Sequence, residues 1–393
     1  MIRSLYRLFT YSPIALIHER RALKDALRNW NGRHLFLFPY LHTGGAEQVH
    51  ADIVSTVADQ QPLVLICGFS RDHAFLSRFP ANAKVVEVPR LLNHPFTRKA
   101  ALREIAARLN ATTDAVLFTA NTVQFFDLLP SIDRGVSAIH LQHAFLYQPE
   151  GNAQHKAWLS HFDRVDRYVF IAEQARDEFA RFLRANGKSV ANDKLVYIPN
   201  KIDRSAEPRP HDRTGILFVG RDSPEKRPEL FLRIAAELER RVPGRTIATA
   251  AGLPARADTG TVKYRGEVRD PQQMAEVYSA HDILVLTSTR EGFPLVVMEA
   301  MAHGLVVVAT PVGDVPRQLD ASMAVITSTI DAEVVVSEMT DAILSLANDP
   351  ERLMQMKEAA HRKALTSWDP ASFRERYRTL LGVISGTARS KSS

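Results

Sequence analysis

Residues 215–240 read GILFVGRDSPEKRPELFLRIAAELER and combine two kinds of pattern. The short apolar run 215–219 is typical of a strand that is buried on both faces, and the apolar positions after Pro228 recur at helical spacing. Gly220 permits a tight turn between the two patterns. The stretch therefore predicts a strand, a loop and a helix, as in a parallel sheet with crossover helices.

The same alternation occupies most of the chain. We predict strands at His34–Phe38, Leu63–Cys67, Lys84–Val88, Ala115–Thr119, Ala138–Gln142, Arg167–Ile171, Gly215–Val219, Thr246–Ala251, Val262–Tyr264, Ile283–Thr287 and Val306–Thr310. We predict helices at Gly45–Ala58, Ala100–Leu109, Glu173–Asn186, Pro228–Arg240, Pro271–Ser279, Leu295–Ala302, 331–347, 350–365 and Phe373–Val383. The polar, proline-rich stretch 199–213 has no periodicity and predicts an interdomain linker.

The chain of 393 residues is thus predicted to form two doubly wound, Rossmann-like α/β domains that face each other across a cleft. We expect a basic segment at 1–33, a first domain at 34–200, a second at 201–370, and a last helix with a disordered tail at 371–393. Ligands of open α/β sheets bind at the carboxyl ends of the strands, so the loops there are the first candidates for a site.

Composition excludes several classes of protein. The single cysteine, Cys67, excludes an internal disulfide framework and argues against a Cys/His zinc site. The net charge of +6 is concentrated at the two ends: residues 1–33 carry seven basic and two acidic side chains, and residues 351–393 carry nine and four. The chain between them is net negative, unlike a uniformly basic nucleic-acid binder.

The N-terminus predicts a membrane contact rather than a membrane span. No run of about 18 apolar residues is present, and the first residues lack the apolar core of a signal peptide. A helix at the N-terminus would place Ile2, Leu5, Tyr6 and Phe9 on one face, with Arg3 and Arg7 at another edge. This pattern suits a helix lying in a membrane interface; packing on the protein, or a frayed end, is the alternative.

Two groups of charged residues follow strands in the second half. Arg221 and Lys226 lie between a strand and a helix N-terminus, a combination that suits a diphosphate; the alternative is a solvated basic loop. Glu291 lies just past a strand, and Glu299 lies in the next helix. Their carboxylates suit sugar and ribose hydroxyls, and the amides at Phe293–Leu295 suit anionic oxygens; either acid alone would be a solvated charge.

The first half contributes a glycine pair and two histidines. Gly44 and Gly45 follow the first predicted strand and expose backbone amides that a diphosphate or an acceptor can approach. His42 adjoins this loop, and His143 lies just past another predicted strand. A histidine in a loop is more often structural, so both are predictions that depend on their place at strand ends.

Four motifs in the second half resemble the retaining GT-B glycosyltransferases of family 4. They are Gly220-Arg221-x4-Lys226, Gly266-Glu-Val-x-Asp270, Ser288-Thr-Arg-Glu-Gly-Phe-Pro-Leu-Val-x2-Glu299-Ala-Met-Ala-x-Gly304 and Ala309-Thr-Pro-Val-Gly313. The resemblance is strong over most of residues 199–320 and continues more weakly through the first half, where Gly44-Gly-Ala-Glu47 is similar to the start typical of the family. Two features depart from it: Arg317 replaces an acid, and Lys201 follows Asn200 where glycine is usual.

The resemblance implies roles for these residues. Arg221 and Lys226 would hold the donor diphosphate and stabilise the leaving group, while Glu291 would contact the sugar and Glu299 the ribose. The backbone of Phe293, Pro294 and Leu295 would line the sugar and phosphate, and the loop that joins Gly266 to Val268 would lie near the nucleobase. His143 would lie close to the anomeric carbon. The domain 34–200 would bind the acceptor, 201–370 the nucleotide sugar, and the last helix would return to the first domain.

The sequence thus predicts a retaining, metal-independent glycosyltransferase that needs no cofactor. The substrate would be a nucleotide-diphosphate sugar, and the acceptor a glycan or lipid-linked molecule of bacterial surface polysaccharide or glycolipid synthesis. We expect a cytoplasmic protein whose residues 1–33 contact the anionic inner face of the plasma membrane, and no nucleic-acid partner. The alternatives are another GT-B enzyme such as a nucleotide-sugar epimerase, or a non-catalytic binding protein with this fold. A glycosidase is rejected because both carboxylates lie beside the basic pair.

Overall fold

The computed structural model describes residues 12–42, 44–73, 75–145, 153–191, 193–254 and 261–382. These residues form two compact units: one contains the chain up to Ile198 together with the residues from Arg374 on, and the other spans Pro199–Phe373. The predicted N-terminal membrane helix, with Ile2, Leu5, Tyr6 and Phe9, lies outside the described residues.

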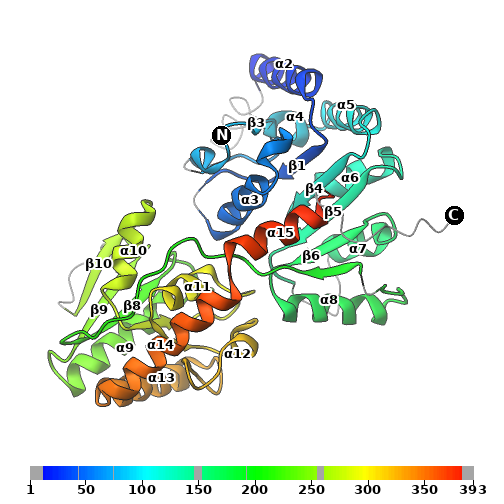
Figure 1. Ribbon diagram of the computed structural model, residues 1–393. Helices are drawn as coiled ribbons and strands as arrows, with labels where there is room; N and C mark the ends of the chain where they lie inside the picture. Colours follow the sequence, from blue (N-terminus) through cyan, green and yellow to red (C-terminus); the bar gives the residue numbers. More distant parts are fainter. Residues whose placement is uncertain are drawn as a thin grey trace, which may run out of the picture. The chain divides into compact units, whose positions relative to one another are not determined.

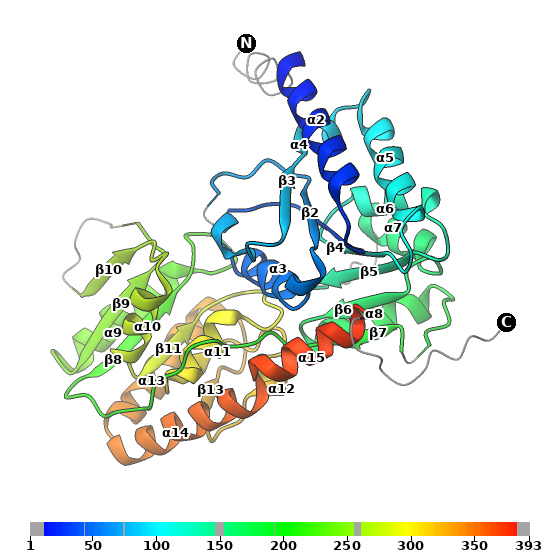
Figure 2. The same ribbon diagram turned by 45° about the horizontal axis from the view of Figure 1, so that its top comes forward.

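The N-terminal unit is built on a parallel sheet with the strand order β3-β2-β1-β4-β5-β6-β7. Its strands are β1 (His34–Phe38), β2 (Leu63–Ile66), β3 (Lys84–Glu87), β4 (Val116–Ala120), β5 (Ser137–Gln142), β6 (Arg167–Phe170) and β7 (Leu195–Tyr197). Its helices are α2 (Pro13–Asn29), α3 (Gly45–Ser55), α4 (Pro89–Asn93), α5 (Arg98–Asn110), α6 (Gln124–Leu128), α7 (Ala153–His161) and α8 (Glu173–Ala185). Helices α2, α4 and α5 lie side by side (Figures 1 and 2).

The C-terminal unit has a second parallel sheet, with the strand order β10-β9-β8-β11-β12-β13. Its strands are β8 (Thr214–Val219), β9 (Thr246–Ala251), β10 (Val262–Gly266), β11 (Ile283–Leu286), β12 (Val306–Ala309) and β13 (Ala324–Ile326). Its helices are α9 (Pro228–Arg241), α10 (Pro271–Ser279), α11 (Leu295–Ala302), α12 (Val315–Gln318), α13 (Ala332–Ala347) and α14 (Pro350–Ser367). The predicted linker 199–213 contains neither helix nor strand.

Continuous apolar strands explain why helices cover both faces of this sheet. In β12, Val306 and Val308 belong to the core on the side of α9 and α13, whereas Val307 and Ala309 belong to the core on the side of α11 and α14. Successive strand residues point to opposite faces, so four consecutive apolar residues serve both cores at once.

Helix α15 (Pro370–Leu380) carries the chain back into the N-terminal unit. Tyr377 is fully buried with its ring near Phe118 of β4, and Arg378 donates 2.9 Å to the Thr56 carbonyl and 2.7 Å to Asp59. The sequence predicted this helix at Phe373–Val383, but it begins earlier, at Pro370. Proline fits the first turn, where its missing N–H is not needed.

In both sheets the strand order reverses at one point, between β1 and β4 and between β8 and β11. In open α/β sheets, ligands bind at the carboxyl ends of the strands beside such a point. The loops after β8 and β11 carry Lys226 and Glu291, and the loop after β1 carries the glycine pair.

Candidate functional site

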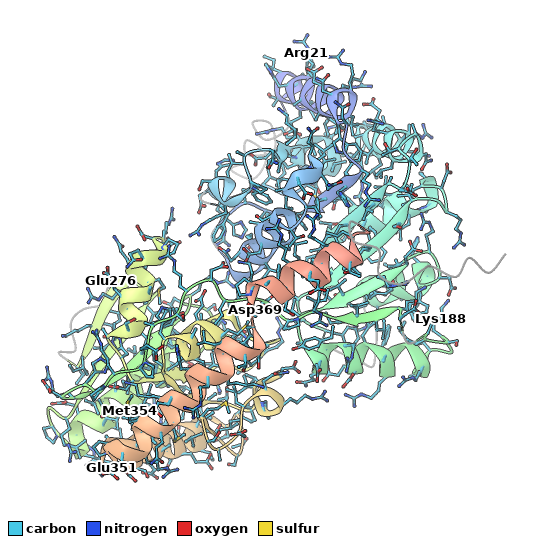
Figure 3. The ribbon with its side chains drawn as sticks, in the orientation of Figure 1. Arg21, Lys188, Glu276, Glu351, Met354 and Asp369 are labelled. Carbon is cyan, nitrogen blue, oxygen red and sulfur yellow. The ribbon has the colours of Figure 1, made fainter. Side chains whose placement is uncertain are left out.

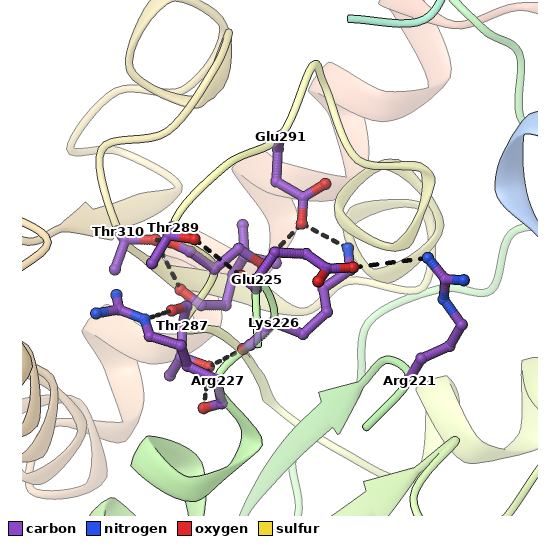
Figure 4. Close-up of polar contacts among 10 residues, drawn as sticks. Arg221, Glu225, Lys226, Arg227, Thr287, Thr289, Glu291 and Thr310 are labelled. Atoms are coloured by element: carbon purple, nitrogen blue, oxygen red, sulfur yellow. Dashed lines mark hydrogen bonds and ion pairs between the residues drawn. The ribbon is translucent and has the colours of Figure 1, made fainter. Parts of the chain in front are cut away.

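Lys226 and Glu291 meet at the switch point of the C-terminal sheet. The Lys226 Nζ lies 2.5 Å from Glu291 Oε1, and the Ser288 hydroxyl donates to the same oxygen at 2.7 Å (Figure 4). The two side chains are 19% and 12% exposed, so water screens the pair only partly. Two residues 65 positions apart in the chain are thus held as one charged pair.

Arg227 braces the loop that carries Lys226. Its φ of +48° is a left-handed backbone conformation that residues other than glycine rarely adopt. Its guanidinium donates to the carbonyl oxygens of Thr287 at 2.7 Å and Ile330 at 2.6 Å, and the Thr287 hydroxyl donates to the Lys226 carbonyl at 2.7 Å. These bonds hold the unusual backbone that aims Lys226 at Glu291.

Arg221 lies on the same loop but makes a looser contact. Its Nη2 is 3.7 Å from Glu225 Oε1, and its side chain is 70% exposed (Figure 4). The structure therefore brings Lys226 and Glu291 together, whereas the Arg221 guanidinium is mostly exposed and contacts Glu225 of the same loop.

Close backbone contacts shape the start of this loop. Gly220 donates its N–H to the Ala251 carbonyl at 3.0 Å, and a Cβ on Gly252, whose φ is +89°, would lie 2.5 Å from the Gly220 oxygen. Gly252 in turn donates to the Gly266 carbonyl at 2.6 Å. Val268 follows as a half-buried residue between Glu267 and Arg269, which pair at 2.8 Å.

Glu299 is oriented by a buried tyrosine. The Tyr278 hydroxyl donates to Glu299 Oε2 at 2.8 Å, and the Tyr278 ring is 2% exposed and stacked beside His303. Burial, with the neighbouring carboxylate, raises the pKa of Tyr278 well above its usual value, so the phenol stays a donor. Glu299 is thereby fixed on α11, separately from the Lys226–Glu291 pair.

The loop between Glu291 and α11 is locked by a second glycine turn. Gly313 has φ +54°, and a Cβ there would lie 1.9 Å from the Gly292 oxygen, which accepts the Asp314 N–H at 2.8 Å. Phe293 is buried and packs on Trp368, so its side chain belongs to the core and only its backbone borders the loop. Pro294 caps α11, Leu295 is its first residue, and Arg317 lies in α12.

In the N-terminal unit, a carboxylate closes the glycine loop. Gly44 is the N-cap of α3, Gly45 is its first residue, and a Cβ on Gly44 would lie 2.2 Å from the Glu47 carboxylate. Glu47 is 8% exposed, and His42 Nε2 lies 3.7 Å from it. An acid at the third helical position suits the positive helix end and occupies part of the positive potential that an anion would meet there.

His143 pairs with a histidine that the sequence analysis did not single out. Its Nε2 lies 2.9 Å from Nε2 of His50 on α3. Burial lowers the pKa of His143 to about 4 and that of His50 well below its usual value, so both rings are neutral near pH 7. The structure places His143 and the glycine loop in one unit and the charged pair in the other.

A cavity of about 220 Å³ lies away from these residues. Its lining includes His211, which precedes β8, Asp282, which precedes β11, and Lys357 of α14, so it lies at the amino ends of these strands. Lys357 and Asp282 form a buried ion pair there at 2.5 Å. This end of an open sheet holds structural groups, whereas ligands bind at the carboxyl ends.

Four supporting residues were not predicted from the sequence: His50, Arg227, Tyr278 and Thr287. Glu47 and Ser288 were named only as members of family motifs, although Ser288 carries a local signal, since it stands three residues before Glu291 just past a strand. Within the described ranges, no three His, Cys, Asp or Glu side chains gather as a metal site, and no helix there is long and apolar enough to span a membrane.

Sequence comparison finds similar proteins for part of the chain. Residues 213–349 match the family model described as Glycosyl transferases group 1. D-inositol 3-phosphate glycosyltransferase of Mycobacterium tuberculosis, and the same-named protein of Mycobacterium bovis, are 33% identical over 230 residues, which cover 53% of this chain and 47% of theirs. The chain thus spans about half the length of the curated relatives it matches.

Structural comparison covers both units. HepE of Anabaena, solved in complex with UDP, has a TM-score of 0.70 at 18% identity over 90% of this chain and 100% of that one. TarM has a TM-score of 0.70 at 12% identity over 89% and 98% of the two chains, and the pneumococcal O-GlcNAc transferase GtfA has 0.70 at 11% identity over 90% and 99%. The chain therefore has the two-domain GT-B α/β fold.

Proposed function

We propose that this protein is a glycosyltransferase that moves a sugar from a nucleoside diphosphate sugar to an acceptor hydroxyl. One observation carries the proposal: Lys226 and Glu291, 2.5 Å apart, join a cation for a phosphate to a carboxylate for sugar hydroxyls at the β8/β11 switch point. The match to Glycosyl transferases group 1 over residues 213–349 supports it. Structural neighbours that bind UDP support a nucleotide donor.

The cations act on the leaving group. As the bond between the sugar carbon and the diphosphate oxygen breaks, its electron pair stays on that oxygen. Lys226 and the exposed Arg221 stabilise the negative charge that develops there, the type of electrostatic stabilisation that contributes most to many enzymes. Glu291 accepts hydrogen bonds from the sugar, and Glu299, held by Tyr278, accepts them from the ribose.

We further propose that the reaction is retaining and metal-independent, as in family 4. The acceptor hydroxyl forms its bond on the face that the diphosphate leaves, and its proton passes to the departing phosphate oxygen. The chain then needs no general base. The neutral state of His143 and the Glu47 carboxylate beside the glycine loop, with His42 Nε2 3.7 Å from it, fit an uncharged hydroxyl acceptor on the N-terminal unit.

For the acceptor we propose a glycan or lipid-linked molecule of bacterial surface polysaccharide or glycolipid synthesis. One side of α2 supports a membrane contact: Ile14 and Ile17 are 69% and 52% exposed, and Lys24 is exposed further along the helix. Arg21 on the same helix is exposed as well (Figure 3). Apolar groups next to cations suit an anionic lipid surface. Flotation with anionic liposomes tests this, since a chain lacking residues 1–30 is expected to stay unbound; equal binding of both chains would contradict it.

The proposed activity is tested with a panel of UDP-, GDP- and ADP-sugars. We expect one donor to release its nucleoside diphosphate only when a glycan or glycolipid acceptor is present, and Lys226→Ala to abolish that release. Arg362→Ala, an exposed cation of α14, is the matched control and is expected to retain it. Sugar conversion without an acceptor would instead indicate an epimerase, and failure of every nucleotide sugar to raise thermal stability would indicate a different ligand.

A further inference from the structure

His50 is a buried histidine of α3 with one unsatisfied ring nitrogen. Its side chain is 1% exposed and stacks on Phe38, with 4.2 Å between ring centroids and 4° between planes. Its Nε2 meets Nε2 of His143 at 2.9 Å. Its Nδ1 is buried and has no hydrogen-bond partner among the described residues.

The contact between the two Nε2 atoms contains one proton, because both rings are neutral. If His143 donates, then His50 accepts through Nε2 and must carry its own proton on Nδ1. If His50 donates, its Nδ1 is a bare acceptor, and His143 carries its proton on Nδ1 instead. The hydrogen bond made by one ring nitrogen thus determines whether the other nitrogen of the same ring is a donor or an acceptor.

Three histidines at or just past the ends of helices show which acceptor a buried Nδ1–H can find. The Nδ1 atoms of His161, His281 and His303 each lie 2.6–3.0 Å from the carbonyl oxygen four residues earlier. His50 has no such partner among the described residues. In native structures a buried N–H without an acceptor is rarer than a buried acceptor without a donor, so the arrangement with a bare Nδ1 on His50 is favoured.

We propose that His50 is a positioning residue that donates its Nε2–H to His143 and thereby fixes His143 in the Nδ1–H tautomer. Resting on the proposed function, His143 then donates Nδ1–H to an oxygen of the sugar-bearing substrate. In this tautomer Nδ1 has no lone pair to take a proton, and Nε2 is occupied by His50. His143 is therefore a hydrogen-bond donor and not a general base.

The tautomer is tested without any substrate, by long-range ¹H–¹⁵N correlation spectra of the full chain labelled at histidine. Signals are assigned with His143→Gln. We expect His143 to be protonated at Nδ1 in the unaltered protein. His50→Phe retains a ring against Phe38 but has no donor, and we expect His143 to shift to the Nε2–H form. His50→Gln restores an N–H at a similar reach and is expected to restore the Nδ1–H form.

A matched control separates this effect from the loss of any histidine. His161→Gln removes a ring whose Nδ1 bonds within α7 and is expected to leave the His143 signals unchanged. An Nε2–H tautomer for His143 in the unaltered protein, or an Nδ1–H tautomer that persists in His50→Phe, would overturn the proposal. Unfolding of His50→Phe would show as collapsed dispersion, and His50→Leu then replaces it in the same comparison.

Kinetics test the donor role. We expect His50→Phe to lower kcat for transfer by about tenfold or more, because a catalytic histidine in the wrong tautomer loses its function, with KM for the nucleotide sugar unchanged. His50→Gln is expected to recover most of kcat. A tautomer switch without a change in kcat would refute the donor role, whereas absence of transfer in the unaltered protein with every donor would refute the proposed function and leave the tautomer result standing.

Discussion

Replacing Glu291 by glutamine is expected to have opposite effects on nucleotide binding and on sugar transfer. The amide oxygen of the new side chain still accepts the Ser288 hydroxyl, so the substitution removes the charge and little else. Lys226 then loses the carboxylate that it meets at 2.5 Å. Its ammonium becomes more available to a diphosphate, while the sugar loses a charged hydrogen-bond acceptor.

The magnitude follows from the burial of the pair. Unit charges about 4 Å apart interact by about 4 kcal/mol at an effective dielectric constant of 20, and removing one partner of a fully buried pair costs about 3–5 kcal/mol. Exposed pairs contribute about 0–1 kcal/mol. With side chains 19% and 12% exposed, the pair lies between these limits, at about 2 kcal/mol.

Only part of this energy reaches the ligand, because a solvated ammonium gains back some hydration. We expect about 1.4 kcal/mol, so Glu291→Gln binds UDP about tenfold more tightly. We expect kcat/KM for transfer to fall about 100-fold, as when a charged transition-state contact is lost.

Isothermal titration calorimetry with UDP and a transfer assay on the same preparation measure both effects. Glu225→Gln is the matched control, because its carboxylate contacts the exposed Arg221 at 3.7 Å and its removal is expected to change UDP affinity little. Weaker UDP binding by Glu291→Gln, or unaltered transfer, would refute the reasoning.

Three further predictions concern the framework. Gly313→Ala places a Cβ 1.9 Å from a carbonyl oxygen and is expected to lower the unfolding free energy, measured by urea denaturation, by about 3 kcal/mol or more. Gly244→Ala, which is also at positive φ but has nothing within 4 Å of the new Cβ, is expected to cost about 1 kcal/mol. Equal losses in the two variants would contradict the contact. Lys357→Met leaves the buried Asp282 carboxylate without its lysine, although His211 Nδ1 at 2.8 Å and the Gly215 N–H at 2.9 Å still contact it. We expect a cost of about 3 kcal/mol, most of it recovered by adding Asp282→Asn; a single variant as stable as the parent would contradict the pair. Burial lowers the pKa of His34 to about 4, whereas an unfolded histidine has a pKa of about 6.5, so protonation favours the unfolded chain as the pH falls. Between pH 7 and pH 5 we expect the N-terminal unit to lose about 2 kcal/mol of unfolding free energy that His34→Gln does not lose. Identical pH profiles of stability for the two proteins would contradict this.

The sequence predicts the sheet strands well because they are buried on both faces. Runs such as HLFLF at His34–Phe38 and TIATAA at Thr246–Ala251 are strands with the predicted bounds. The short β7 and β13 were missed, since three residues give no periodicity and their side chains are mostly half-buried. Helix α2 was not predicted, because its buried side holds few apolar residues, Leu23, Ala26 and Leu27, within a strongly charged segment.

Part of the candidate site could also be predicted from the sequence, and part could not. Lys226 and Glu291 were predictable because each follows a strand that lies at a switch point. The contact between Lys226 and Glu291 could not be predicted, since it depends on the left-handed backbone of Arg227 and on the close approach of Gly292 and Gly313. Both features need contacts between loops that are distant in the sequence. The role of His50 could not be predicted, because it lies among the buried residues of α3, where the sequence does not distinguish it from a structural core residue.

The binding of the sugar nucleotide to Lys226→Ala tests the central claim most directly. The claim is that the Lys226–Glu291 pair holds the diphosphate and the sugar of the donor. With the donor identified by the panel, calorimetry on this variant is expected to show about 30-fold weaker binding, equivalent to about 2 kcal/mol, with the Arg362→Ala control unchanged. Equal affinity of Lys226→Ala and the unaltered protein would contradict the account.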